Sequence, residues 1–140
     1  IKQTIFASAT ALCAVALSLP TFSQSAATAD LPAVCTTVAA HNMGGGVGSM
    51  MGGMDQAHQD LMADMDEMNA KMMQGGMAPD IDVAFVCSMI AHHQGAISMA
   101  EAELAHGDDQ WAKDTAKKII DAQEQEITEM LAWLAEQPVQ

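Results

Sequence analysis

Residues 89–99 read MIAHHQGAISM, and this stretch decides the fold because its apolar residues recur at helical spacing. It lies between a helix start signal at Pro79-Asp80 and a stop signal at Gly107. The pattern therefore predicts one long helix over residues 81–106.

Both histidines of this stretch are expected to face a neighbouring helix. At helical spacing one stripe is formed by Phe85, Met89, His92, Ala96 and Met99. His93 lies beside the stripe. Ala96, with Gly95 beside it, has little side-chain volume, so a facing helix is expected to approach closely there. Two readings stay open: core histidines hydrogen-bonded to the neighbouring helix, or ligands of a metal ion.

The N-terminal residues 1–29 resemble a secretory signal peptide. Lys2 supplies a positive start, residues 5–19 an apolar core, Pro20 a break, and Ala27-Thr28-Ala29 a cleavage site of the A-x-A kind. The apolar run is too short for a membrane-spanning helix. We expect an exported chain, periplasmic or secreted, with no membrane insertion in its mature form.

The chain is strongly acidic, with a net charge of −13 that becomes −14 once Lys2 is removed. Such a charge argues against nucleic acid or anionic lipid as a partner and is suited to attracting cations. Solubility alone is an equally good explanation of the charge.

Two cysteines, Cys35 and Cys87, follow the predicted signal peptide. In an oxidising compartment an even pair favours a disulfide over two metal-binding thiolates. The sequence therefore predicts a Cys35–Cys87 disulfide.

Further helices are predicted on both sides of the central one. A short helix opens at Asp30-Leu31-Pro32 with Asp30 as its N-cap, a second runs over residues 55–73 from an Asp55 cap, and a last one runs over residues 110–135. No segment has the pattern of a strand. The predicted fold is all-α: a small antiparallel helical bundle with a disulfide-tethered N-terminal arm.

This reading divides the chain into three parts. They are the signal peptide (residues 1–29), an arm with a Met/Gly-rich loop (residues 30–54) and the helical bundle domain (residues 55–137). The short connection before residue 110 makes the last two helices antiparallel neighbours. Gln123 and Glu126 then fall near the level of the two histidines. They are predicted either to satisfy a buried polar pair or to orient the imidazoles of a metal site.

Methionine is the unusual residue of the chain, with 13 copies, all after residue 29. Met is usually core filler, but Met50, Met51 and Met54 lie in or beside a glycine-rich loop that offers no helix face to bury them. Soft thioethers prefer Cu(I), and histidine also accepts Cu(II). Met54, His58 and Met62 share one helix face and form a further candidate cluster.

Two segments resemble a known family. Asp82-x2-Phe85-x3-Met89-x2-His92-His93-x2-Ala96-x2-Met99-Ala100 and Ile120-x2-Gln123-x2-Glu126-Ile127-x2-Met130-x2-Trp133 resemble a bacterial family of secreted proteins described as a domain of unknown function. This family includes the periplasmic copper-binding protein CopM and is similar to ferritin-like four-helix bundles. The resemblance covers about residues 80–135. It implies copper binding through Met and His, with Met89, His92, His93, Met99 and Met130 as the matching positions.

The first expectation is thus a binding protein without catalysis. It would hold copper, as Cu(I) or Cu(II), or silver, and would exchange ions with periplasmic copper proteins. The tightest binding is expected at His92 and His93, with weaker binding on the loop and at His58. The alternatives are a ferritin-like metal-dependent oxidase and a Met-rich interaction bundle that binds no metal.

Overall fold

The computed structural model describes residues 30–36 and 51–138, and within these ranges every regular element is helical. The elements are η2 (Ala33–Cys35), η4 (Met51–Gly53), α1 (Gln56–Met62), α2 (Met65–Gly75), α3 (Ile81–His106) and α4 (Gln110–Ala135). The all-α prediction is confirmed. The predicted signal peptide and the loop residues up to Met50 lie outside the described residues.

The two long helices begin and end where the sequence predicts. Asp80 caps α3, its Oδ1 accepting from the backbone N–H groups of Asp82 and Val83 at 2.9 and 3.1 Å. Asp109 caps α4 in the same way through Ala112 N at 2.9 Å. Aspartate is a favoured N-cap because its carboxylate satisfies N–H groups that have no partner within the helix. Gly107 follows the last residue of α3.

The helix predicted over residues 55–73 is wrong as one continuous element. It is divided into α1 and α2 by a turn at residues 63–64. Asp64 has φ −98° and ψ 6°, and its Oδ2 accepts from Ser98 Oγ of α3 at 2.5 Å. This tertiary contact holds Asp64 at the start of a new helix. The local sequence contains no Gly or Pro that would predict the break.

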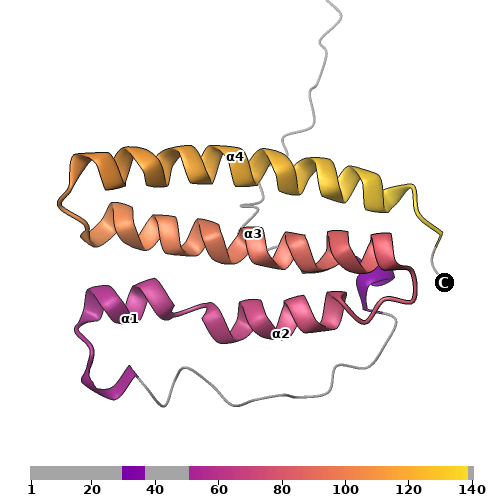
Figure 1. The fold of residues 1–140 in the computed structure, drawn as a ribbon, viewed down its shortest axis with the longest axis horizontal. Helices are drawn as coiled ribbons and strands as arrows, with labels where there is room; N and C mark the ends of the chain where they lie inside the picture. The colour runs from indigo at the N-terminus through magenta and orange to yellow at the C-terminus, as the bar shows by residue number, and fades with distance from the viewer. Residues whose placement is uncertain (1–29, 37–50, 139–140) are drawn as a thin grey trace, which may run out of the picture.

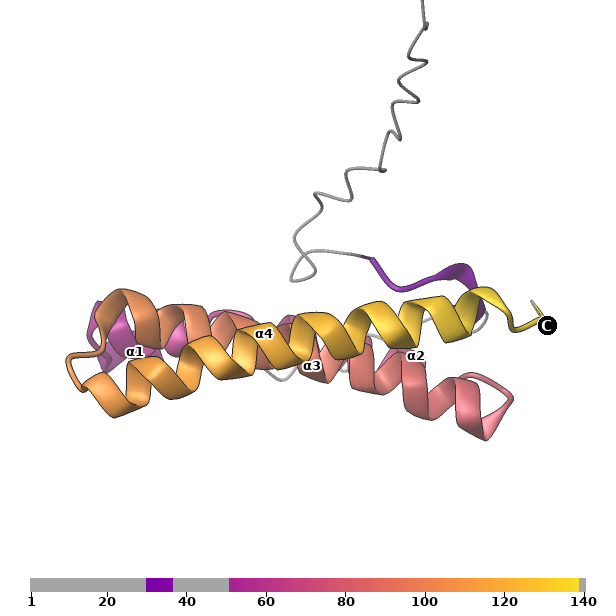
Figure 2. The same cartoon turned by 90° about the horizontal axis from the view of Figure 1, so that it is seen from above.

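The helices form three antiparallel rows, with α3 in the middle (Figure 1). The α1 and α2 helices share the row on one side of α3, and α4 lies along the other side. The view from above shows α4 lying over α3 and crossing it at an angle (Figure 2). Two sides of α3 are therefore covered by helices. These contacts determine which of its side chains are buried.

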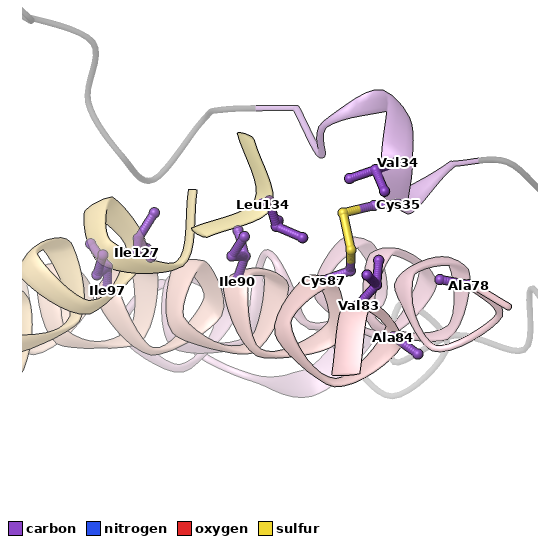
Figure 3. Packing of buried hydrophobic residues seen from close by; sticks show 10 residues of the cluster. All are labelled: Val34, Cys35, Ala78, Val83, Ala84, Cys87, Ile90, Ile97, Ile127 and Leu134. Carbon is purple, nitrogen blue, oxygen red and sulfur yellow. A yellow bond between two sulfur atoms is a disulfide. The ribbon is translucent and has the colours of Figure 1, made fainter. Parts of the chain in front are cut away.

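The apolar core lies mainly between α3 and α4 (Figure 3). Ile90 and Ile97 of α3 and Ile127 of α4 are almost fully buried there. At one end, η2 lies over α3 and adds Val34 to the same cluster. Burial of these branched side chains supplies the main hydrophobic stabilisation of the helix pair.

The Cys35–Cys87 disulfide is confirmed and joins η2 to α3, across a sequence separation of 52 and with a Cα–Cα distance of 5.6 Å. Both cysteines are buried in the core (Figure 3). The N-cap expected at Asp30 is wrong, because the short 3-10 helix begins after Pro32 and has no side-chain cap. The ring of Pro32 fixes the backbone at the helix start instead.

Two glycines allow α2 to approach α3 closely. A Cβ on Gly75 would lie 2.8 Å from the backbone carbon of Cys87, and a Cβ on Gly95 would collide with the sulfur of Met68. Gly95 was expected to admit a close neighbour, and Met68 of α2 is that neighbour.

The expected orientation of the stripe from Phe85 to Met99 is wrong. Phe85 is 62% exposed, Met99 is 39% exposed, and His92 is also exposed. Because α3 is apolar around most of its circumference, its pattern does not tell which arc meets a neighbour. The covered arcs are those of Ile90, Ile97 and His93 toward α4 and of the small residues toward α2. His92 and Met99 of the stripe lie outside these arcs.

By length and composition α3 could cross a membrane, and 56% of its most apolar window is buried inside the protein. A helix packed between two rows needs apolar residues on both sides. Its central place in the fold accounts for that composition.

Candidate metal centre

A cavity of about 450 Å³ opens between α3 and α4. Its lining includes two pairs of residues with metal-binding side chains: Met89 and His93 from α3, and Glu126 and Met130 from α4. Each pair is four residues apart, so both members of a pair lie on one face of their helix. The remaining walls are apolar or acidic and come from Phe85, Val86, Glu129 and Trp133.

His93 is the buried polar centre of this cavity, at 6% exposure. Its Nε2 lies 2.5 Å from Oε2 of Glu126, so the carboxylate of α4 orients a ring carried by α3. Its Nδ1 is buried and has no hydrogen-bond partner among residues 30–36 and 51–138. A buried nitrogen without a partner is costly, which marks Nδ1 as a position where a ligand would be stabilised.

The donor set suits a soft cation. Two thioethers and one imidazole nitrogen are available in one cavity, and such ligands favour Cu(I) over hard ions. When Glu126 accepts the N–H of Nε2, the lone pair of a neutral imidazole lies on Nδ1. The contact between histidine and carboxylate is of the kind that orients metal-binding imidazoles. Among the described residues, no three His, Cys, Asp or Glu side chains are grouped to hold an ion, so any site here depends on methionine sulfur.

The structure separates the candidates of the long helix into two groups. Met89, His93 and Met130 line the cavity, whereas His92 and Met99 are not among its lining residues. The rings of His92 and His93 meet edge to face with centroids 6.0 Å apart. Adjacent residues on a helix diverge by about 100°, which is why one ring is buried and the other exposed.

The second candidate cluster lies on and beside α1. Met54 is exposed just before the helix, His58 is exposed in its first turn, and Met62 is half-buried at its end. None of them lines the cavity between α3 and α4. Met50 lies outside the described residues, as does the side chain of Met51.

The two residues predicted to orient the histidines differ in what they contact. Glu126 reaches His93, as described above. Gln123 is half-buried on α4 and does not line the cavity, so its role stays a prediction.

The sequence reasoning missed Trp133 and Phe85 as walls of the cavity. Both are large aromatic residues that remain partly exposed, Trp133 at 36%. Their spacing gave a usable signal: Met89 lies four residues after Phe85, and Trp133 three residues after Met130, so each aromatic ring is one helical turn from a thioether.

Fold and cavity together define a small disulfide-linked helical protein with sulfur and imidazole donors between two antiparallel helices. The chain belongs to the DUF305 family, described as a domain of unknown function, whose sequence profile matches residues 15–134. The match includes all of α1 to α4 up to residue 134. No curated protein was found to match the chain.

Proposed function

We propose that this protein is an exported copper-binding protein that holds Cu(I), and with it Ag(I), in the cavity between α3 and α4. The proposal rests on two observations: Met89, His93 and Met130 line one cavity, and the buried Nδ1 of His93 has no hydrogen-bond partner among the described residues. A soft monovalent ion would accept two thioethers and this nitrogen as ligands. Such a protein sequesters or buffers copper without a catalytic step.

The proposed export of the protein favours methionine over cysteine as the copper ligand. In an oxidising compartment thiols are lost to disulfides, and the two cysteines after residue 29 are already joined to each other. Methionine needs no deprotonation and keeps its affinity for Cu(I) over a wide pH range. The acidic chain would concentrate cations around it, and a periplasmic copper protein is the natural partner for exchange of the ion.

The test is a competition titration of the full chain with Cu(I) and Ag(I) against a chromogenic Cu(I) chelator. Replacing Met89 and Met130 together by Leu should lower the Cu(I) affinity of the tightest site at least about tenfold, because loss of two ligands costs more than loss of an outer-sphere contact. Leucine has nearly the same volume as methionine, so the fold should be kept.

The matched control is the double variant Met73→Leu and Met77→Leu, whose methionines are 49% and 40% exposed and lie outside the cavity. It should bind Cu(I) as tightly as wild type. His93→Ala should weaken binding and His92→Ala should not. Equal Cu(I) affinity in wild type and the Met89/Met130 variant would contradict the proposal, with circular dichroism as the check that both are folded.

A further inference from the structure

Large apolar side chains remain exposed on α3 and on the part of α4 beside it. On α3 they are Ile81, which is 79% exposed, and Phe85, and on α4 the largest is Trp133. Phe85 and Trp133 line the cavity between the two helices from opposite sides, together with Met89 and Met130. We refer to these five residues as the apolar face. Neighbouring exposed apolar side chains of this kind mark interaction surfaces.

The apolar face lies on the side of α3 that points away from η2. Ile81, Phe85 and Met89 are spaced four residues apart, so they follow one another along one side of the helix. Cys87, which is bonded to η2, comes two residues after Phe85 and thus about 200° further around α3. Figure 2 shows η2 on one side of α3 and α4. The exposure of Ile81 and Phe85 shows that no element within residues 30–36 and 51–138 covers the other side.

The shape of the apolar face suits a helix as its partner. Its two walls are the antiparallel helices α3 and α4, and the cavity of about 450 Å³ lies between them. An amphipathic helix can place apolar side chains from successive turns into a groove of this form. Methionine side chains adapt their shape to such a partner, and aromatic residues and methionine are enriched in protein interfaces.

The charged residues beside the apolar face are carboxylates. Glu126 and Glu129 line the cavity, and both are exposed. Asp82 follows Ile81 directly. Neither α3 nor the part of α4 that follows Lys118 contains a single Lys or Arg. The groove is therefore apolar inside and negative at its edge.

This charge selects among the possible occupants of the groove. A second copy of the chain would bring a net charge of −13 and the same carboxylates against this surface, and an anionic lipid surface would be repelled in the same way. A polypeptide that carries Lys or Arg beside its apolar side chains matches both the groove and its edge.

We propose that the apolar face is a docking surface for an amphipathic helix of a partner protein. The apolar side chains of that helix enter the groove, and its Lys or Arg side chains pair with carboxylates such as Glu129. Phe85 and Trp133 are the main contacts, because exposed aromatic residues at the centre of a surface contribute most to binding. The docking needs no metal ion in the cavity, so it does not rest on the proposed copper binding.

The test is a titration of a labelled amphipathic peptide, built from Leu and Lys at helical spacing, with the metal-free full chain, followed by fluorescence anisotropy. We expect saturable binding that the double variant Phe85→Gln and Trp133→Gln weakens at least about tenfold. The matched control is Trp111→Gln, which removes an aromatic residue of α4 that is 76% exposed and lies outside the cavity. It should bind the peptide as wild type does. Circular dichroism checks that all variants are folded.

A measurement that keeps Phe85 and Trp133 protects the test from an unfolded double variant. In Trp111→Phe, Trp133 is the only tryptophan left. Its emission should shift to shorter wavelength when the Leu/Lys peptide binds, because the docked helix removes water from the ring. Binding without such a shift would place the peptide elsewhere and overturn the proposal.

Two control peptides separate docking from attraction by net charge. A peptide with Glu in place of Lys should not bind, and one with the Leu residues scrambled should bind at least about tenfold more weakly, because it has no apolar stripe. Equal binding by either peptide, or no binding of the Leu/Lys peptide, would contradict the proposal. A concentration-dependent mass of the free chain that the Phe85/Trp133 variant abolishes would assign the surface to a second copy instead. The Cu(I) titration of the Met89/Met130 variant keeps both aromatic residues, so the two proposals fail separately.

Discussion

At the scale of single residues, histidine side chains make two kinds of contact in this molecule. His93 is buried and meets a carboxylate of the neighbouring α4, whereas His58 is exposed and meets the cap of its own helix. The first contact requires the packing of two helices, and the second requires only the local turn. The two contacts therefore depend on different levels of structure even though the residue type is the same.

The carboxyl groups of Asp55 and Asp60 give a prediction at this scale. Because hydrogen bonds lower both pKa values in the folded protein, their stabilising contribution is complete above about pH 3.8. It is lost as the pH falls through the lowered values. A titration followed by the carboxyl ¹³C shifts should give midpoints below 3.8 for both residues.

Gln56→Ala is the matched variant for this titration. The amide of Gln56 donates to Asp60 Oδ1 at 2.7 Å and has no contact with Asp55 in the described residues. It should raise the midpoint of Asp60 and leave that of Asp55 unchanged. Midpoints at or above 3.8 for both residues in wild type would contradict the assignment.

At the scale of elements, the contact between α2 and α3 depends on glycine. The space beside Gly75 is filled by backbone atoms of Cys87 and Ser88, which cannot move without shifting α3. The space beside Gly95 is filled by the Met68 side chain, which can change its rotamer. The two glycines therefore differ in how much they restrict the packing.

The element-scale prediction is that Gly75→Ala destabilises the protein by about 1–3 kcal/mol through overpacking. Gly95→Ala should cost less, since Met68 can move and alanine improves helix propensity by about 1 kcal/mol. Urea unfolding followed by circular dichroism measures both. A Gly75→Ala protein as stable as wild type would show that α2 and α3 are not held at this separation.

At the scale of the whole molecule, the disulfide attaches a distant part of the chain to the helices. η2 adds little to the core beyond Val34 and Cys35, but Cys87 lies at the centre of α3's packing. Closing a loop of this length restricts the unfolded chain more than it adds contacts to the folded one.

Replacing Cys35 and Cys87 together by Ser should therefore lower the free energy of unfolding by about 3–4 kcal/mol. Wild type in excess reductant should show the same midpoint of urea denaturation as this variant, apart from the small effect of two buried hydroxyls. An unchanged midpoint on reduction, or two alkylatable thiols in protein exported and purified without reductant, would contradict the prediction.

The amino-acid sequence by itself determined the elements whose signals are local. Helical periodicity, with a start signal at Pro79-Asp80 and a stop at Gly107, placed α3 and α4 correctly, because such signals depend on a few neighbouring residues. The even cysteine pair predicted the disulfide. The short connection between the two helices brought Glu126 to the level of the histidines, where it contacts His93.

Only the tertiary structure decided what depends on more than one helix. The division between α1 and α2 coincides with a contact of Asp64 with Ser98, 34 residues away. The choice of His93 over His92 as the buried ring depends on which arcs of α3 its neighbours cover. When a helix is apolar around most of its circumference, its sequence pattern does not indicate which face is buried. Packing against neighbouring helices, rather than periodicity, selects that face.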